Sequence, residues 1–245
     1  MRLRWIIIVL VVVFIVVVSF YATDYVRNSG GPVGARGRDM LSGPFLGIQF
    51  EIDYMPGMRP DPGALDRFAG FVFEHTGKLV FFSQSEIQSY AGPSSGDPTL
   101  PCLLPPCPMN GYTMEQIGEI YDRERSVLPP PGVISVYILY ADLPSSEGEQ
   151  VGAASFCATC VVLFRSGADA NYAVEAIILA HEFGHLLGLC SINYPDVRSH
   201  CDAGHSTNPN DLMYYAPNTN DPDVQALRLD ANDLADLQDL RSGAL

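Results

Sequence analysis

The sequence predicts an α+β domain in which strands and helices alternate along the chain, preceded by one N-terminal transmembrane helix. Two observations support this fold class. Apolar residues recur at strand spacing and at helical spacing in turn from Phe45 onward, and an almost wholly apolar stretch opens the chain. About 200 of the 245 residues follow that stretch, so we expect one well-buried domain.

The opening stretch predicts a membrane anchor over residues 1–22. Arg4 and Asp24 are separated by 19 uncharged residues, which as a helix would span about 28 Å, close to the hydrocarbon thickness of a bilayer. The alternative is a cleaved signal peptide, but Phe20 is bulky where cleavage requires a small residue. In either case we expect the rest of the chain outside the cytoplasm, membrane-anchored in the first case and secreted in the second.

The remaining chain divides into a flexible linker and a folded domain. Residues 23–44 are rich in Gly, Ser and Arg and predict the linker, and residues 45–245 form the domain. Runs of β-branched and aromatic residues predict strands over residues 46–54, 79–82, 133–140 and 154–164. Apolar residues at helical spacing predict helices over residues 62–74, from the capping residue Thr113 onward, and over 171–188.

The charge of the chain argues against a nucleic-acid partner. The formal charge is −14, from 28 acidic and 14 basic residues, and such a surface repels phosphates. The aliphatic and aromatic content is too high for a disordered acidic chain, so we interpret the acidity as a solvated surface.

The six cysteines form an even set that an oxidising compartment could pair. Their connectivity stays open, because six cysteines allow 15 pairings. Cys102 and Cys107 lie in one proline-rich loop, and we expect a local disulfide there. Cys157 and Cys160 could be a redox or zinc-binding pair, but they lie in an apolar, strand-like run without a second such motif, which favours a structural role.

The predicted helix over residues 171–188 carries an HExxH motif. His181 and His185 are four residues apart, so they lie one turn apart on the same face and can offer two imidazole nitrogens to one metal. Glu182 is rotated by about 100° from His181, where it can reach a water at the metal without being a ligand. Without a metal this apolar helix would bury three ionisable groups without partners, so we favour a zinc site over structural histidines.

Zinc requires a further protein ligand, and the chain contains no glutamate after His185. Histidine is available instead, at His200 and His205. Asp196 and Asp202 are possible oxygen ligands, although we interpret them as solvated loop carboxylates.

Two segments resemble the metzincin clan of zinc metallopeptidases, which includes matrixins and archaemetzincins. They are His181-Glu-Phe-Gly-His-Leu-Leu-Gly188, similar to the clan's HExxHxxGxxH signature, and residues 205–215, which look like its methionine turn with Met213 beneath the metal. The resemblance implies a zincin-like fold with a mixed, twisted sheet, an active-site helix and a C-terminal helix, the last similar to residues 229–238. The sequence departs from the signature at Ser191, where the clan has its third histidine.

The missing histidine must then come from an inserted loop. We favour His205, because it leads directly into the turn of Met213, and His200 is the alternative. A Cys190–Cys201 disulfide would tie the end of the helix to this loop and bring both histidines near the metal. The resemblance also implies that Tyr215 stabilises the oxyanion and that residues 154–164 form the edge strand along which substrate lies.

The sequence therefore predicts a zinc-dependent endopeptidase that uses Zn²⁺ at His181, His185 and His205, with Glu182 as the base. Its expected partners are a peptide or protein substrate and, through the N-terminal helix, a membrane. Two alternatives stay open. One is a zinc hydrolase of a non-peptide substrate, and the other is an inactive, membrane-tethered zincin-fold binding module. Retention of Glu182 argues against the second, because structural zinc needs no general base.

Overall fold

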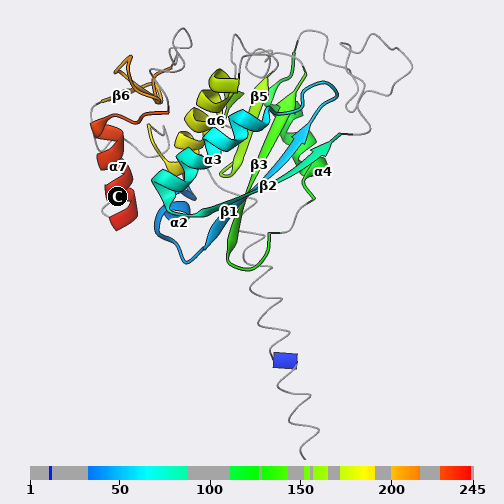
Figure 1. Ribbon diagram of the computed structural model, residues 1–245, viewed down its shortest axis with the longest axis horizontal. Helices are drawn as coiled ribbons and strands as arrows, with labels where there is room; N and C mark the ends of the chain where they lie inside the picture. Colours follow the sequence, from blue (N-terminus) through cyan, green and yellow to red (C-terminus); the bar gives the residue numbers. More distant parts are fainter. Residues whose placement is uncertain are drawn as a thin grey trace, which may run out of the picture.

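The computed structural model describes residues 11–12, 33–87, 111–126, 129–142, 152–154, 157–164, 172–190, 200–215 and 227–243. Helices α3 (Pro62–Thr76) and α6 (Tyr172–Leu187) lie side by side across one face of a five-stranded sheet (Figure 1). Helix α4 (Met114–Glu124) covers the opposite face, where Tyr121 packs against Tyr137 of the sheet. The two faces thus carry different helices, with the HExxH motif on the α6 side.

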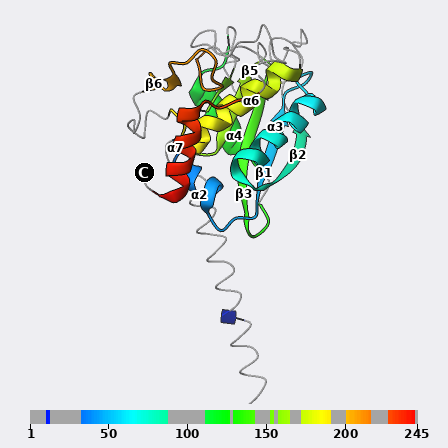
Figure 2. The ribbon, with the colours of Figure 1, turned by 60° about the vertical axis from the view of Figure 1, so that its left-hand side comes forward.

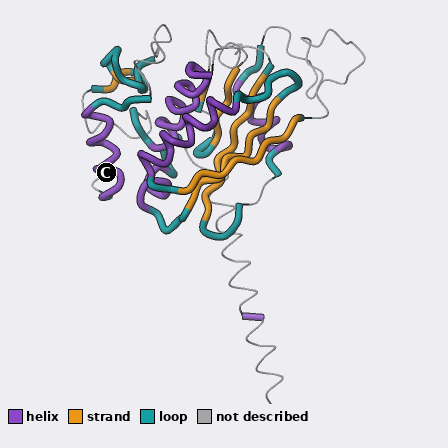
Figure 3. The backbone as a smooth tube through the Cα atoms, in the orientation of Figure 1, coloured by secondary structure: helices purple, strands orange, loops and turns teal. Residues whose placement is uncertain are grey.

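The sheet is mixed, as predicted, and its strands lie side by side in one layer (Figure 3). Four of its strands are parallel neighbours in the order β2 (Leu79–Glu86), β1 (Gly47–Tyr54), β3 (Val133–Ala141) and β5 (Cys160–Phe164). Strand β4 (Gly152–Ala153) pairs antiparallel with β5 and ends the sheet. Every residue of β3 is buried, because this central strand has helices over both of its faces.

Aromatic side chains fix helix α6 on the sheet. The ring of Phe50 in β1 lies 4.9 Å from that of Phe68 in α3 and 5.7 Å from that of Phe183 in α6, with edge-to-face geometry. Phe183 lies inside the HExxH motif, between Glu182 and His185. The same packing that builds the core therefore sets the height of the motif above the sheet.

The linker prediction is wrong for residues 37–42, which form helix α2 (Gly37–Ser42). Met40 and Leu41 are buried, and α2 packs beside α6 and the C-terminal helix α7 (Ala231–Ser242), as Figure 2 shows. A Cβ atom on Gly37 would collide with the carbonyl oxygen of Leu187, so glycine permits this contact. Two apolar residues among Gly and Arg gave no periodic signal, and tertiary packing decides the structure here.

The prediction of one strand over residues 154–164 is also wrong. The segment belongs to a hairpin, in which β4 precedes residue 154, and β5 begins only at Cys160. A disulfide joins Cys157 to Cys160 in the connection between the two strands. The edge of the sheet is therefore β4, and β5 is an inner strand.

Several predictions fall on residues that the structure does not describe. Of the predicted anchor over residues 1–22, only Val11 and Val12 are described, and both are helical. Among the described residues, no helix is both long and apolar enough to cross a membrane. The Cys102–Cys107 loop and Asp196 also lie outside the described residues.

Candidate metal centre

Three histidines that are distant in the sequence converge at one end of helix α6. His181, His185 and His205 each offer a ring nitrogen, and these atoms all lie within 4.8 Å of one another. The rings of His181 and His185 lie 4.8 Å apart between centroids, and the ring of His205 lies 5.3 and 5.2 Å from them. The structure thus brings together the three histidines that the sequence proposed as ligands.

The orientation of two rings is set by main-chain carbonyl groups. His181 Nδ1 lies 2.7 Å from the oxygen of Leu212, and His185 Nδ1 lies 3.3 Å from the oxygen of Leu189. A carbonyl oxygen only accepts, so in each ring Nδ1 donates its hydrogen. In the neutral tautomer that results, Nε2 carries a lone pair.

The two Nε2 atoms of His181 and His185 face each other at 3.2 Å. With a lone pair on each, they cannot form a hydrogen bond to one another, and a cation between them would relieve the repulsion. Tetrahedral zinc with Zn–N bonds of about 2.0–2.1 Å holds two nitrogens about 3.3–3.4 Å apart. The observed separation and the donor type therefore fit a zinc ion.

Burial keeps these imidazoles neutral. Desolvation lowers the pKa of His181 to about 4 and that of His185 well below its usual value, and the neighbouring histidines act in the same direction. The pKa of His205 is also lowered, chiefly by burial. Because a neutral imidazole is the form that binds a metal, the site is prepared for coordination at neutral pH.

His205 reaches the centre at the end of a tight hairpin. Strands β6 (Cys201–Asp202) and β7 (His205–Ser206) pair antiparallel around Ala203 and Gly204, whose φ angles are 47° and 88°. Two consecutive positive φ angles characterise the type I′ turn, which suits a two-residue hairpin. The Ala203 carbonyl also accepts a hydrogen bond from the His205 ring.

A disulfide attaches this hairpin to helix α6. Cys190 and Cys201 are bonded, which is one of the pairings that the sequence left open, and their Cα atoms lie 5.5 Å apart. Cys190 lies just beyond the helix, after Gly188, which has a φ of 101°. The hairpin is thereby held against the end of the helix that carries His185.

His200, the alternative ligand, lies in a different cluster. Its Nε2 is 3.1 Å from Asp233 Oδ1 in helix α7 and 3.6 Å from Asp236 Oδ2. The sequence analysis favoured His205 over His200 as the third ligand, and the geometry likewise places only His205 beside His181 and His185. Asp202 lies in β6 and is exposed, outside the described groups that could hold a metal.

Met213 lies beneath the centre, against the helix. Its side chain is fully buried, and a Cβ atom on Gly184 would collide with the Met213 sulfur. Gly184 stands between the two motif histidines, so its missing side chain lets the methionine turn approach the helix. The preceding residue of the turn, Leu212, supplies the carbonyl that orients His181.

The side chain of Glu182 extends from helix α6 to the edge strand β4. It is almost fully buried, and a Cβ atom on Gly152 would lie 2.9 Å from Glu182 Oε1. The carboxyl group accepts a main-chain hydrogen bond from Ala154, but burial dominates and raises its pKa to about 8. The carboxyl group is therefore fixed between helix α6 and strand β4, next in sequence to His181.

Tyr215 is exposed and packs against Tyr214, with ring centroids 4.6 Å apart. Among the described interactions, none joins Tyr215 to the three histidines. Its predicted catalytic role therefore stays a prediction.

Sequence reasoning missed several groups that shape the site. The carbonyls of Leu212, Leu189 and Ala203 carry no sequence signal, because every residue has one. Gly152 and the Ala203-Gly204 turn did have a signal, since glycine at a strand or before a short strand often marks a close approach or a tight turn.

Comparison with solved structures shows a related fold. The crystal structure of archaemetzincin from Methanopyrus kandleri matches with a TM-score of 0.52 and 15% identity, covering 80% of this chain and 96% of that one. Metalloproteinase-II from Bacteroides fragilis and a zinc-dependent peptidase from Methanocorpusculum labreanum each match with a TM-score of 0.46 and 15% identity. They cover 82% and 77% of this chain, and 54% and 99% of their own.

The sequence itself matches no model of a known protein family and no curated protein. The similarity to archaemetzincin therefore rests on the structure, and at 15% identity it concerns the fold. It confirms the zincin-like fold that the two short motifs predicted.

Proposed function

We propose that the chain is a zinc-dependent endopeptidase whose zinc ligands are His181, His185 and His205. The observation that carries this proposal is the pair of unprotonated Nε2 atoms of His181 and His185, held 3.2 Å apart beside a third imidazole. Two facing lone pairs in a buried site are unfavourable without a cation, and three imidazoles are a common donor set of catalytic zinc.

Glu182 is the proposed general base and acid. Bound zinc would activate a water for attack and polarise the scissile carbonyl of the substrate. Glu182 takes the proton of the attacking water and delivers it to the leaving amine, so that the carboxyl group returns to its starting state. The packing of Glu182 against Gly152 supports this role, because it limits the positions that the carboxyl group can take.

The position of the site at the sheet edge supports a peptide substrate. Strand β4 ends the sheet and lies directly beside Glu182. An extended peptide can add to such an edge through main-chain hydrogen bonds, which places a peptide bond next to the base. This edge assignment replaces the one predicted for residues 154–164.

Tyr215 is the proposed oxyanion donor. Its support is its position two residues after Met213 and its exposed side chain, whose hydroxyl group is hydrogen-bonded to that of Tyr214.

The Glu182→Gln variant tests the mechanism. We expect it to retain one zinc per chain by metal analysis, because the ligands are unchanged, and to lose peptidase activity by about 10²–10⁴-fold, because the base is gone. Near wild-type activity would show that the assigned mechanism is wrong.

A peptide library, assayed with and without a chelator, tests the reaction class. We expect chelator-sensitive cleavage by the wild-type protein and none by Glu182→Gln. A zinc-loaded wild-type protein that cleaves no peptide would instead favour a non-peptide hydrolase or a binding module.

A further inference from the structure

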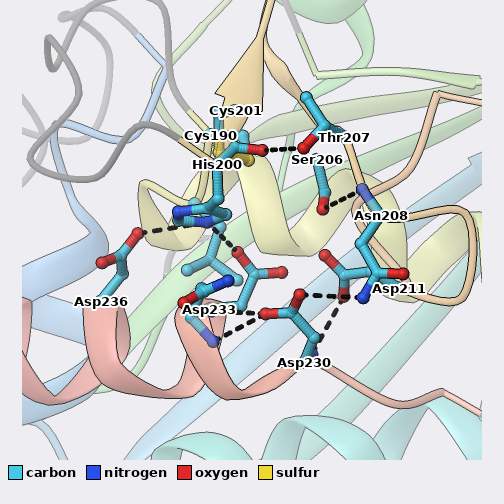
Figure 4. Close-up of polar contacts among 12 residues, drawn as sticks. Cys190, His200, Cys201, Ser206, Thr207, Asn208, Asp211, Asp230, Asp233 and Asp236 are labelled. Atoms are coloured by element: carbon cyan, nitrogen blue, oxygen red, sulfur yellow. Dashed lines mark hydrogen bonds and ion pairs between the residues drawn. A yellow bond between two sulfur atoms is a disulfide. The ribbon is translucent and has the colours of Figure 1, made fainter.

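A second polar cluster lies outside the histidine centre, where the methionine turn meets the start of helix α7. Asp211 lies two residues before Met213, Asp230 caps the N-terminus of α7, and Asp233 lies in the first turn of α7. Each of these residues offers a carboxylate oxygen, and the three oxygens lie within 4.8 Å of one another (Figure 4). The proposed function gives this cluster no role.

Two of these carboxyl groups are buried, and in each of them only one of the two oxygens has a hydrogen-bond partner among the described residues. Asp233 is 0% exposed and Asp211 is 3% exposed. Asp233 Oδ1 pairs with His200 Nε2 at 3.1 Å, and Asp211 Oδ1 accepts the main-chain N–H of Asp230 at 3.1 Å. The Oδ2 atoms of both residues are buried and have no hydrogen-bond partner within the described chain. Figure 4 shows these two carboxyl groups turned toward each other.

The surrounding charges do not neutralise this pair. The ionisable groups that face it are the carboxyl groups of Asp230 and Asp236, the imidazole of His200 and, on the Asp211 side, the imidazole of His181. Burial and the neighbouring Asp211 raise the pKa of Asp233 to about 9. The buried Oδ2 atoms of Asp211 and Asp233 thus need either a shared proton or a cation, because two neighbouring buried carboxylates repel each other when both are ionised.

We propose that Asp211, Asp230 and Asp233 bind a divalent cation of the calcium type. Three carboxylates are hard oxygen donors, which Ca²⁺ accepts in flexible geometry, whereas Mg²⁺ demands a near-ideal octahedron and zinc prefers nitrogen and sulfur. Asp230 is partly exposed, which gives the cation and its remaining water ligands a route from solvent. The bound cation would satisfy both unpartnered oxygens and displace the proton that Asp233 otherwise holds.

The cation would connect the methionine turn to helix α7. Asp211 is followed by Leu212, whose carbonyl group orients His181. The main-chain N–H of Leu212 donates a hydrogen bond to the carbonyl oxygen of Arg228, which lies just before α7. A cation on Asp211 and Asp233 would therefore stabilise the segment that carries Met213 without contacting the three histidines.

Calcium titration of the full-length protein tests the site. The protein is depleted of free divalent cations, supplemented with one equivalent of zinc, and heated at increasing CaCl₂ concentrations. With a dissociation constant of about 1 mM, 10 mM Ca²⁺ is expected to raise the thermal midpoint by about 3–5 °C. A parallel MgCl₂ series is expected to give a clearly smaller rise. Isothermal titration of the same protein should show one calcium site per chain.

Two variants and a control locate the effect. Asp211→Asn and Asp233→Asn should abolish the response to Ca²⁺, while Asp66→Asn, which removes an exposed carboxylate of helix α3, should keep it. The proposal is overturned if the wild-type protein does not respond, or if all three variants respond equally. It is also overturned if Asp233→Asn is more stable than wild type without calcium and wild type shows no calcium response, because a shared proton then explains the pair. None of these readouts depends on catalysis, so the result is independent of the proposed peptidase function.

Discussion

At the scale of single residues, helix α6 and the hairpin of β6 and β7 hold the side chains of the proposed centre in different ways. His181, Glu182 and His185 follow from helical periodicity, because residues one and four apart have fixed relative directions on a helix. The third histidine does not, since its position depends on a hairpin, two positive φ angles and a disulfide. The sequence could therefore name His205 and His200 as candidates, but only the folded chain distinguishes their surroundings.

Replacement of each histidine tests the ligand assignment. We expect His205→Ala to lower zinc occupancy and abolish peptidase activity, because it removes one of three imidazoles at the centre. His200→Ala should keep zinc and partial activity, because His200 contacts Asp233 instead. Metal analysis and rates are measured on the same preparations. If His200→Ala lost zinc and His205→Ala retained it, His200 would be the third zinc ligand in place of His205.

Gly152 provides a second residue-scale prediction. A methyl group at this position would approach Glu182 Oε1 to 2.9 Å and the Ile178 side chain to 2.8 Å, so the base must move. We expect Gly152→Ala to reduce kcat by about 10–100-fold with zinc retained, because a displacement of about 1 Å has this effect on an aligned catalytic group.

Gly118→Ala in helix α4 is the matched control, because a Cβ atom there meets nothing within 4 Å. Its activity should equal that of wild type. If Gly152→Ala also kept full kcat, the edge strand would have no part in positioning the base.

At the scale of elements, amphipathic and capped segments were predicted well. Helix α3 begins after Asp61, which accepts hydrogen bonds from the amides of Gly63 and Ala64, and helix α4 has a capping box between Thr113 and Gln116. The strand predicted over residues 154–164 began before β5 and missed β4, because the residues before β5 are apolar and lack a strong turn signal. Helix α2 is too short to show periodicity.

Glu175 of helix α6 connects strand β3 and the start of helix α3, and its raised pKa predicts that the stability of the fold depends on pH. Its Oε1 accepts hydrogen bonds from the Tyr140 hydroxyl of β3, at 2.7 Å, and from the amide of Asp61 before α3, at 3.2 Å. Burial raises its pKa from 4.5 to about 7. The folded state therefore binds more protons than the unfolded state between these values, so the free energy of unfolding falls as pH rises through this window.

Glu175→Gln should remove this dependence. Between pH 5 and pH 8, we expect the wild-type protein to lose about 1–3 kcal/mol more unfolding free energy than the variant, in urea titrations of the metal-free forms. Glu119→Gln, at an exposed position of α4, should follow wild type. If the unfolding free energies of wild type and Glu175→Gln changed with pH in parallel, Glu175 would have the same pKa in the folded and unfolded states.

At the scale of the whole molecule, the revised domain boundary shortens the tether to the proposed membrane anchor. Val33 already packs against the core and helix α2 begins at Gly37, so only residues 23–32 would remain to connect the proposed anchor to the domain. About ten extended residues reach at most about 35 Å. An anchored domain would thus be kept close to the membrane surface, where its substrates would be encountered.

The anchor itself is the last prediction. We expect the full-length protein to sediment with membranes and to resist alkaline carbonate, because an apolar helix of about 17 residues partitions far more strongly than an interfacial one. A chain that lacks residues 1–22 should be recovered in the soluble fraction with the same zinc content, because the three proposed zinc ligands are His181, His185 and His205. If the native protein is instead soluble and begins near Thr23, the segment is a cleaved signal peptide, and the secreted domain would be free of the distance limit that the tether would impose.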